Sequence, residues 1–232
     1  GGTDRGSVYI YVRSGTTWSQ HAQIQASDAQ DSDNFGWALS VDGDYAIVGA
    51  YVEDTGGLDA GSAYIFYKSG TTWSQQAKIQ SSDIQADDRF GVSVDIDGDY
   101  VIVGAEYEDT GGSNAGSAYV FVRSGTSWTQ QAILRASDAQ ADDRFGGYDP
   151  TVSISGSFAV IGAHNEDAGG SNAGAAYVFS RSGSTWTEVK KIVASNPTAS
   201  DFFGQTVAID GTTVLVGARE EDTKASAAGA AY

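Results

Sequence analysis

A repeat of about 55 residues constrains the fold of this 232-residue chain more than any other feature. Tryptophans recur at spacings of 55, 55 and 58 residues, at Trp18, Trp73, Trp128 and Trp186. Phe-Gly pairs recur at the same spacings, and Gly-Ala pairs recur at spacings of 55, 58 and 55 residues. Self-similarity at a fixed period means that one supersecondary unit is used repeatedly. The sequence therefore predicts an array of like units.

Each repeat has the pattern of four short β-strands. In the second repeat, residues 91–96 alternate between apolar and polar side chains, and residues 100–104 form a continuous apolar run. Two further strands are expected at residues 117–122 and 128–134, and Gly-containing turns join the strands. No stretch has the sustained 3.6-residue period of a helix. We therefore predict an all-β fold, a β-propeller of ~55-residue four-stranded antiparallel blades with about four blades' worth of sequence. A β-solenoid is the competing architecture, but its rungs are usually shorter.

The Phe-Gly pairs give the expected boundaries of the blades. Residues 1–34 hold strands 3 and 4 of a split first blade, and residues 203–232 hold strands 1 and 2 and the start of strand 3 of a last blade. Three whole blades lie between them, at residues 35–89, 90–144 and 145–202. All belong to one propeller domain or to part of a larger one. We expect either a segment of a longer repeat chain or an assembly with other copies.

The repeated motifs resemble a known family. The segment from Phe35 to Ala50 reads F-G-W-A-L-S-V-D-G-D-Y-A-I-V-G-A, and it resembles the FG-GAP repeats of integrin α-subunit propellers. The fuller pattern, S-D-x-Q-x-x-D-x-F-G with G-A-x-x-E-D-x-G-G and G-S-A-Y-V-F, is similar to the bacterial branch of that family. The resemblance implies a β-propeller in an extracellular or cell-surface protein. It also implies ligand binding or adhesion, and many members hold calcium.

The chain departs from the integrin pattern at the turn between the first two strands of a blade. Integrins carry an Asp-rich calcium loop there, of D-x-D-x-D-G type. The four copies in this chain read Asp42-Gly43-Asp44, Asp97-Gly98-Asp99, Ser155-Gly156-Ser157 and Asp210-Gly211-Thr212. Gly and a small polar residue are all that such a hairpin turn requires. We therefore interpret these positions as turns and do not transfer the integrin calcium site to them.

Composition excludes several classes of function. The chain has 30 acidic and 13 basic residues and a formal net charge of −17, so binding to nucleic acid through a basic patch is not expected. There is no cysteine, which removes disulfides and thiol chemistry. No apolar run approaches the ~20 residues of a membrane helix, and we expect no insertion into a membrane.

The acidic residues are predicted to gather on one face. In an antiparallel blade, the loop between strands 2 and 3 and the link from strand 4 to the next strand 1 lie on the same side. Their carboxylates and Gly-rich backbone could supply the 6–8 oxygen ligands of calcium. The alternative is that these residues cap turns and keep the protein soluble. The candidate metal ligands are Asp28, Asp31, Asp33, Glu53, Asp54, Asp83, Asp87, Asp88, Glu108, Asp109, Asp138, Asp142, Asp143, Glu166 and Asp167. The opposite face carries Arg13, Lys68, Arg123 and Arg181.

Aromatic and histidine residues point to packing and binding more than to catalysis. One tryptophan per blade in fixed register favours packing between blades over sugar stacking. Trp37 has no aromatic counterpart in the other copies (Val92, Gly147, Gln205), so it is expected to act locally. The two histidines do not repeat, and the chain has neither a G-x-S-x-G nor a phosphate-loop motif. We expect no enzyme.

These patterns together predict an extracellular or cell-surface FG-GAP-type propeller. Its function would be non-catalytic binding or adhesion, supported by calcium. A protein or glycan ligand would contact the acidic face, because long loops on a rigid scaffold are where binding sites are built. The alternative is a structural subunit of an extracellular fibre, sheath or surface layer, which would self-associate through its blades.

Overall fold

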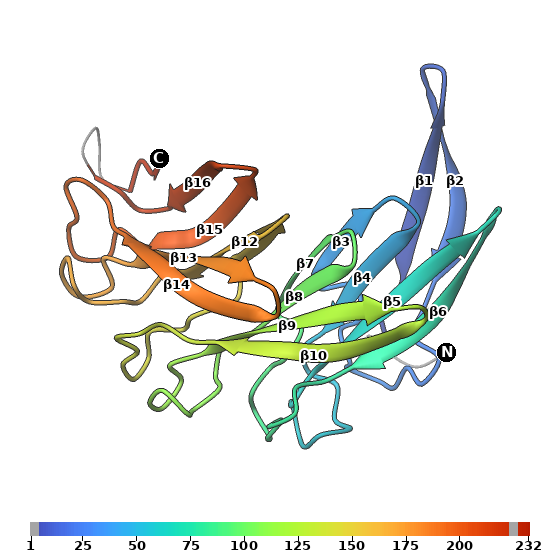
Figure 1. Ribbon diagram of the computed structural model, residues 1–232, viewed down its shortest axis with the longest axis horizontal. Coiled ribbons are helices and arrows are strands. Elements are labelled where there is room, and N and C mark those ends of the chain that lie inside the picture. Colours follow the sequence, from blue (N-terminus) through green and yellow to red (C-terminus); the bar gives the residue numbers. More distant parts are fainter. Residues whose placement is uncertain (1–4, 223–226) are drawn as a thin grey trace.

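The computed structural model describes residues 5–222 and 227–232. The described residues contain strands, turns and loops and no helix, so the all-β prediction is confirmed. Residues 1–4 and 223–226, which belong to the first and last expected blades, lie outside the described part. Figure 1 shows the strands as a succession of small sheets.

Three of the sheets have four antiparallel strands in chain order. The first comprises β3 (Leu39–Asp42), β4 (Tyr45–Ala50), β5 (Ser62–Ser69) and β6 (Thr72–Ile79). The second comprises β7 (Ser93–Asp97), β8 (Tyr100–Ala105), β9 (Ser117–Ser124) and β10 (Ser127–Leu134). The third comprises β11 (Val152–Ser155), β12 (Phe158–Ala163), β13 (Ala175–Ser182) and β14 (Thr185–Ile192). In the second repeat, the first strand begins two residues later than the alternating pattern predicts.

Two incomplete sheets flank these three. A hairpin of β1 (Val8–Ser14) and β2 (Thr17–Ile24) precedes them, and β15 (Phe203–Asp210), β16 (Thr213–Ala218) and β17 (Ala230–Ala231) follow them. The innermost strands β3, β7, β11 and β15 lie side by side in that order. This arrangement is propeller-like. In the described residues, however, the first hairpin and the last sheet lie at opposite ends of the molecule, and the array is open (Figure 1).

The tight turns depend on glycine and not on aspartate. Gly156 has a φ of 57°, in the left-handed region that glycine adopts without strain, and Gly43 has a φ of 56°. The third copy has Ser155 and Ser157 in place of the two acids, and its strands still pair up to the turn, with Ser155 opposite Phe158. The interpretation of these positions as plain hairpin turns agrees with this geometry.

The Phe-Gly and Gly-Ala motifs meet where one sheet packs on the next. A Cβ on Gly49 would lie 1.9 Å from the carbonyl oxygen of Gly91, so side chains at this contact would force the sheets apart. Phe90, beside Gly91, is buried against the rings of Tyr119 and Phe121, at centroid distances of 5.5 and 6.1 Å. The same contact recurs between the second and third sheets and between the third and fourth. The repeated motifs are therefore docking elements between neighbouring sheets.

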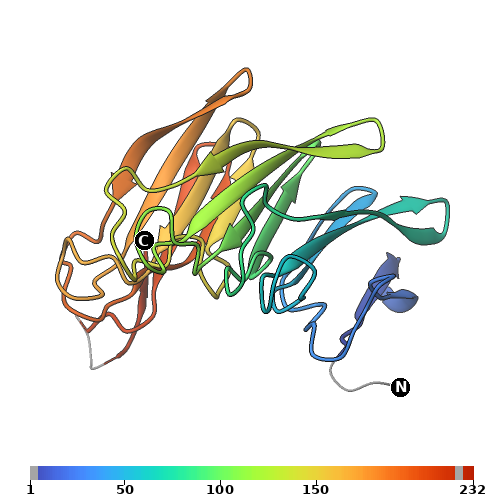
Figure 2. The ribbon, with the colours of Figure 1, turned by 90° about the horizontal axis from the view of Figure 1, so that it is seen from below.

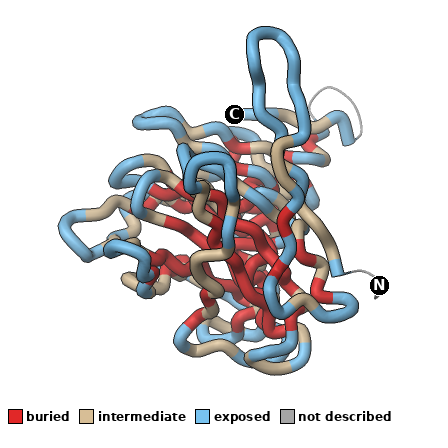
Figure 3. The backbone as a smooth tube through the Cα atoms, turned by 90° about the vertical axis from the view of Figure 1, so that its right-hand side faces the viewer, coloured by how far each residue is buried: buried red, intermediate tan, exposed pale blue. Residues whose placement is uncertain are grey.

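The hydrophobic core consequently lies between sheets, as the buried backbone in Figure 3 shows. The outer strands are joined by the repeated tryptophans: the indole Nε1 of Trp128 donates to Gln76 at 2.9 Å, and that of Trp186 donates to Gln131 at 3.0 Å. Each indole reaches the preceding sheet. The packing interpretation fits these two tryptophans, whereas Trp18 of the first hairpin is 64% exposed.

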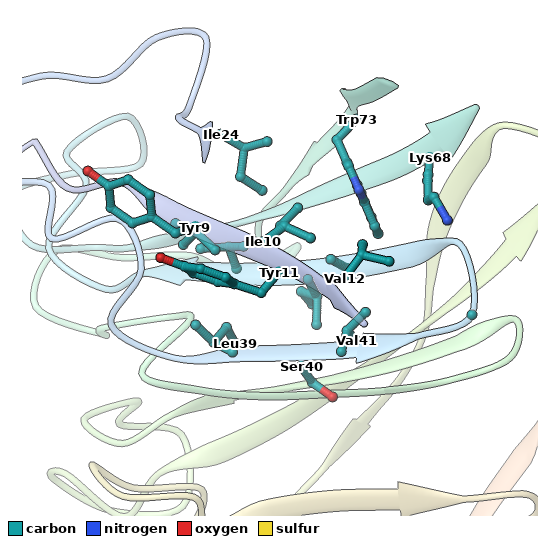
Figure 4. Close-up of a pocket in the computed structure, with 15 residues that line it drawn as sticks. Tyr9, Ile10, Tyr11, Val12, Ile24, Leu39, Ser40, Val41, Lys68 and Trp73 are labelled. Carbon is teal, nitrogen blue, oxygen red and sulfur yellow. The ribbon is translucent and has the colours of Figure 1, made fainter. Parts of the chain in front are cut away.

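Strand β3, which faces the first hairpin, is covered less than the equivalent strand β7 of the next sheet. Leu39 and Val41 on β3 are 58% and 64% exposed, whereas their counterparts Val94 and Ile96 on β7 are 8% and 5% exposed. The described part of the first blade has no strands 1 and 2 to cover them. An apolar hollow of about 320 Å³ remains between β1 and β3, lined by side chains that include Tyr11 (Figure 4).

Candidate functional site

The two ends of the strands carry different connections. Hairpin turns of two residues lie at one end, and the longer 2–3 loops and 4–1 links lie at the other (Figure 2). Each loop is tied to the link that follows it: the amide of Asp87 donates to the carbonyl of Leu58, and that of Asp142 donates to Ser113, both at 2.8 Å. We call this continuous surface the loop face and the opposite end the turn face.

A repeated unit of two carboxylates and one cation lies on the loop face of each whole sheet. In the first sheet, Lys78 Nζ lies 2.7 Å from Asp28 Oδ2 and 2.9 Å from Glu53 Oε1. In the third sheet, Lys191 lies 2.7 Å from Asp138 and 2.8 Å from Glu166.

The second sheet builds the same unit with an arginine. Arg135 Nη2 lies 3.1 Å from Asp83 and 3.2 Å from Glu108. We call each of these three arrangements a carboxylate–cation unit. The structure therefore brings six of the predicted metal ligands together in pairs, each pair around a cation of the chain itself.

These cations were not predicted from the sequence, because they do not keep one register along the repeat. Lys78 and Lys191 follow their repeat tryptophans by five residues, but Arg135 follows Trp128 by seven. A shift of two residues along a strand leaves the side chain on the same face. A search for a base on that face of strand 4 would have found all three.

The glutamates of the first two units, Glu53 and Glu108, are buried, and hydrogen bonds hold them in the charged form. Burial alone would raise the pKa of Glu53, but hydrogen bonds from Ser62, Thr55 and Lys78 outweigh it and hold the pKa below its usual value. The pKa of Glu108 is lowered in the same way. These side chains therefore stay ionised and stabilise the loop from within.

The predicted aspartates outside the units fall into three groups. Asp33, Asp88 and Asp143 are buried and accept hydrogen bonds from backbone amides three residues earlier, at 2.6 or 2.7 Å. Asp54, Asp109 and Asp167 accept from amides five residues later, at 2.7–2.9 Å. Asp31, Asp87 and Asp142 are exposed, and Asp31 pairs with Arg5 at 2.8 Å.

Burial dominates the titration of the first of these groups, that of Asp33, Asp88 and Asp143. It raises the pKa of Asp88 to about 6, because loss of solvation outweighs the hydrogen bond from Gln85 and the nearby charge of Glu108 adds to it. The pKa of Asp143 is raised to about 6 for the same reasons. The buried aspartates and the exposed Asp54, Asp109 and Asp167 therefore organise turns and loops through backbone amides, which is the alternative that the sequence left open.

The fit of this set to calcium is poor. Calcium needs 6–8 oxygen ligands around one point. In the described part of the chain, no group of three or more His, Cys, Asp or Glu side chains converges closely enough to hold a metal ion. The best-placed carboxylates already surround Lys78, Arg135 and Lys191. These residues do not fit a calcium site, and the calcium prediction stays a prediction that only a direct test decides.

A second feature of the loop face lies toward the inner strands. There a hollow of about 560 Å³ is lined by Arg89, Tyr107, Arg144, Tyr148, His164 and Arg219, among others. We call it the central basin. Its size is within the range of roughly 300–1,000 Å³ for small-ligand sites. The sequence analysis did not single out these residues as a site.

These residues could have been found in the sequence, because they differ between repeats at positions next to the constant Phe-Gly and Gly-Ala motifs. The residue before Phe-Gly is Asn34, Arg89, Arg144 or Phe202, and the residue after Gly-Ala is Tyr51, Glu106, His164 or Arg219. In every copy except the first, the residues at both positions line the basin. Sequence positions that differ beside an invariant scaffold are where a repeat protein places its recognition residues.

Two groups in the basin wall have pKa values shifted by burial. Burial lowers the pKa of His164 to about 4, with help from the positive charges of Arg144 and Arg219, so this imidazole is neutral at pH 7. Burial raises the pKa of Glu106 against the opposing pull of Arg144 and Arg89. Three arginines, Arg89, Arg144 and Arg219, therefore face two carboxylates, Glu106 and Asp149, in the lining of the basin.

The fold and the loop face together define a repeat-built, propeller-type binding scaffold. Its sheets dock through Phe-Gly and Gly-Ala contacts, and its long loops share one surface. The chain belongs to the FG-GAP repeat family: the sequence model of that repeat matches residues 18–66, 73–121, 128–179 and 186–232. The resemblance drawn from the motifs is thus confirmed. FG-GAP repeats are typical of extracellular or surface proteins.

The remaining comparison and the search for membrane helices were negative. No curated protein matched the chain. In residues 5–222 and 227–232, there is no helix long and apolar enough to cross a membrane.

Proposed function

We propose that this chain is a non-catalytic binding module of an extracellular or cell-surface protein, serving adhesion. Its ligand is a protein or a glycan that contacts the loop face. The proposal rests mainly on the central basin, where residues that differ between repeats line a hollow on an otherwise repeated scaffold. Variable side chains held by rigid sheets are the usual construction of a binding site.

The chemistry of the repeated acids supports a non-catalytic role. A general acid or base needs a free proton position and contact with a substrate. Glu53 and Glu108 are instead buried and hydrogen-bonded, and each is neutralised by a cation. Their place in every whole sheet indicates a structural purpose. Calcium is not part of this proposal, because the same carboxylates already have partners.

An array experiment tests the proposal. The labelled chain is applied to arrays of glycans and of extracellular proteins, together with two variants. Tyr148→Ala changes the loop face, and Arg13→Gln changes an exposed residue of the turn face. We expect binding to at least one class of ligand that Tyr148→Ala weakens and Arg13→Gln leaves unchanged. Binding that only Arg13→Gln weakens would move the site to the turn face, and no binding at all would contradict the proposal.

The second candidate is a structural subunit of a fibre, sheath or surface layer. The exposed inner face of β3 favours it, since the counterparts of Leu39 and Val41 in the next sheet are buried by a neighbouring sheet. A sheet from a second copy would cover them in the same manner.

A further inference from the structure

The central basin is a cationic site in an acidic protein. Two of its guanidinium groups lie on the same ring: Arg89 is 4.5 Å and Arg144 is 5.2 Å from the centroid of Tyr107. A third, that of Arg219, lies 5.3 Å from the centroid of Phe202. Glu106 pairs with Arg89 at 3.3 Å and offsets one of the two charges beside Tyr107. An anion placed there would relieve the repulsion between Arg89 and Arg144.

The wall of the basin contains polar atoms that lack partners. Glu106, His164 and Gln205 are all more than nine-tenths buried. In the described residues, Glu106 Oε2, His164 Nδ1, Gln205 Oε1 and Arg144 Nε are buried without a hydrogen-bond partner. A buried polar atom without a partner destabilises a folded protein, because it has lost its hydrogen bonds to water. Several of them around one hollow indicate a place that a polar ligand completes.

The backbone that presents the two arginines is strained. Arg89 and Arg144 have φ values of 58° and 56°, in the left-handed region. Asn34, at the same position of the first copy, has a φ of 55°, and asparagine tolerates this conformation better than most residues. Phe202, at the same position of the last copy, has a φ of 53°, so the fold keeps this conformation in every copy and presents whichever side chain stands there.

An aromatic platform adjoins the basin. Trp37 lies 4.9 Å from Tyr51 and 4.7 Å from Tyr148 between ring centroids, and Arg89 lies 5.7 Å from the centroid of Tyr51. Trp37 and Tyr148 are exposed. A second hollow of about 330 Å³ is lined by both rings and shares Tyr148 and Asp149 with the basin. Tyr148 and Asp149 come from the three extra residues of the third repeat.

The guanidinium groups and the exposed aromatic rings together indicate which chemical groups a ligand of the basin carries. Guanidinium groups bind carboxylates through paired, charge-assisted hydrogen bonds. Exposed aromatic faces carry a partial negative charge that suits the C–H bonds on the face of a pyranose ring. The net charge of −17 repels the charges of a long polyanion that lie close to the protein surface. At physiological salt this repulsion extends only about 8 Å. One carboxylate on a mostly neutral ligand meets the arginines without that penalty.

We propose that the central basin binds a glycan that carries a single carboxylated sugar. The carboxylate contacts Arg144 and Arg89, and a sugar ring stacks on Trp37 and Tyr148. This inference rests on the proposed function, because it names the ligand of the same loop face. It extends that function by assigning anion recognition to a face whose repeated residues are acidic.

Matched sugar probes test the inference. The probes are 3′-sialyllactose against lactose, and methyl β-D-glucuronide against methyl β-D-glucoside, measured by titration calorimetry and by NMR of the indole of Trp37. We expect each carboxylated probe to bind at least tenfold more tightly than its neutral partner. Arg144→Gln should abolish that difference, and Trp37→Ala should weaken both members of a pair at least tenfold. Arg13→Gln is the control and should change nothing.

The outcomes separate this inference from the proposed function. Equal binding of carboxylated and neutral probes, or binding that survives Arg144→Gln, would overturn carboxylate recognition and leave a loop-face binding module. No binding of either carboxylated probe below 10 mM would overturn the inference, while the arrays would still decide the function. Circular dichroism and the melting temperature of Arg144→Gln confirm that the variant is folded before either reading is made.

Discussion

At the residue scale, the buried glutamate of the 2–3 loop is held by different partners in successive repeats. Ser62 and Ser117 donate to Glu53 and Glu108 at 2.6 Å. The third repeat has Ala175 at this position, and in the described part of the chain Glu166 Oε2 is buried without a hydrogen-bond partner. The third unit therefore lacks two hydroxyl groups: that of Thr55 and Thr110, where it has Ala168, and that of the serine that donates to Oε2 in the first two units.

A serine hydroxyl at position 175 should stabilise the protein. We expect Ala175→Ser to raise the free energy of unfolding by about 0.5–1.5 kcal/mol, the net value of one hydrogen bond. The converse change, Ser117→Ala, should lower it by about 1–3 kcal/mol, because Glu108 would lose a partner while buried. Urea unfolding curves measure both. An Ala175→Ser variant that is no more stable than the parent would show that Glu166 is oriented differently from Glu108.

At the scale of the strand, equivalent positions have unequal burial. Ile96 on β7 packs between two sheets, and Val41 on β3 faces the hollow beside β1. The repeat makes these residues alike in sequence. What differs is the neighbouring sheet.

This difference predicts unequal costs for equivalent substitutions. Ile96→Ala should lower the free energy of unfolding by about 2–5 kcal/mol, since it removes buried methyl groups from a packed interface. Val41→Ala should change it by less than about 0.5 kcal/mol, because the side chain is exposed. Chemical denaturation at low protein concentration measures both.

A large cost for Val41→Ala would contradict the exposed state of β3. It would mean that the inner face of this strand is covered in solution. Sedimentation of the parent chain over a range of concentrations would then show association between copies, in favour of the structural alternative.

At the scale of the whole molecule, one basic residue lies between two carboxylates in each whole sheet. The chain has a net charge of −17, yet Lys78, Arg135 and Lys191 each lie between two carboxylates. Buried carboxylates are stable only when paired and hydrogen-bonded. An internal cation meets that need in each whole sheet.

Removal of divalent ions should consequently leave the fold unchanged. We expect the melting temperature in EDTA to agree within about 1 °C with that in calcium. Lys78→Met is the matched control, since it leaves Glu53 and Asp28 without their shared cation. A cost of about 3 kcal/mol for that loss would lower the melting temperature by roughly 6–12 °C. A drop of several degrees in EDTA for the parent chain, reversed by calcium, would restore the calcium prediction.

Much of the architecture could be read from local pattern. The alternation of residues 91–96, the apolar run of residues 100–104 and the Gly-containing turns predict strands and hairpins, because these depend on neighbours in the chain. The paired acids could be placed on one face for the same reason. Their cationic partners were not predicted from a fixed register, since Arg135 lies two residues out of register with Lys78, and the distance from Arg135 to Asp83 depends on a contact between sheets.

The sequence by itself determined the all-β repeat, the four FG-GAP units and the common face of the loops and links. These follow from short-range rules: a period of two in strands, glycine in turns, and a motif that recurs every 55–58 residues. Only the tertiary structure decided that the carboxylates surround cations of the chain and that Arg89, Arg144 and Tyr107 share one basin. The reason is that both arrangements join residues of successive sheets, and their distances depend on how closely the glycine contacts allow those sheets to dock.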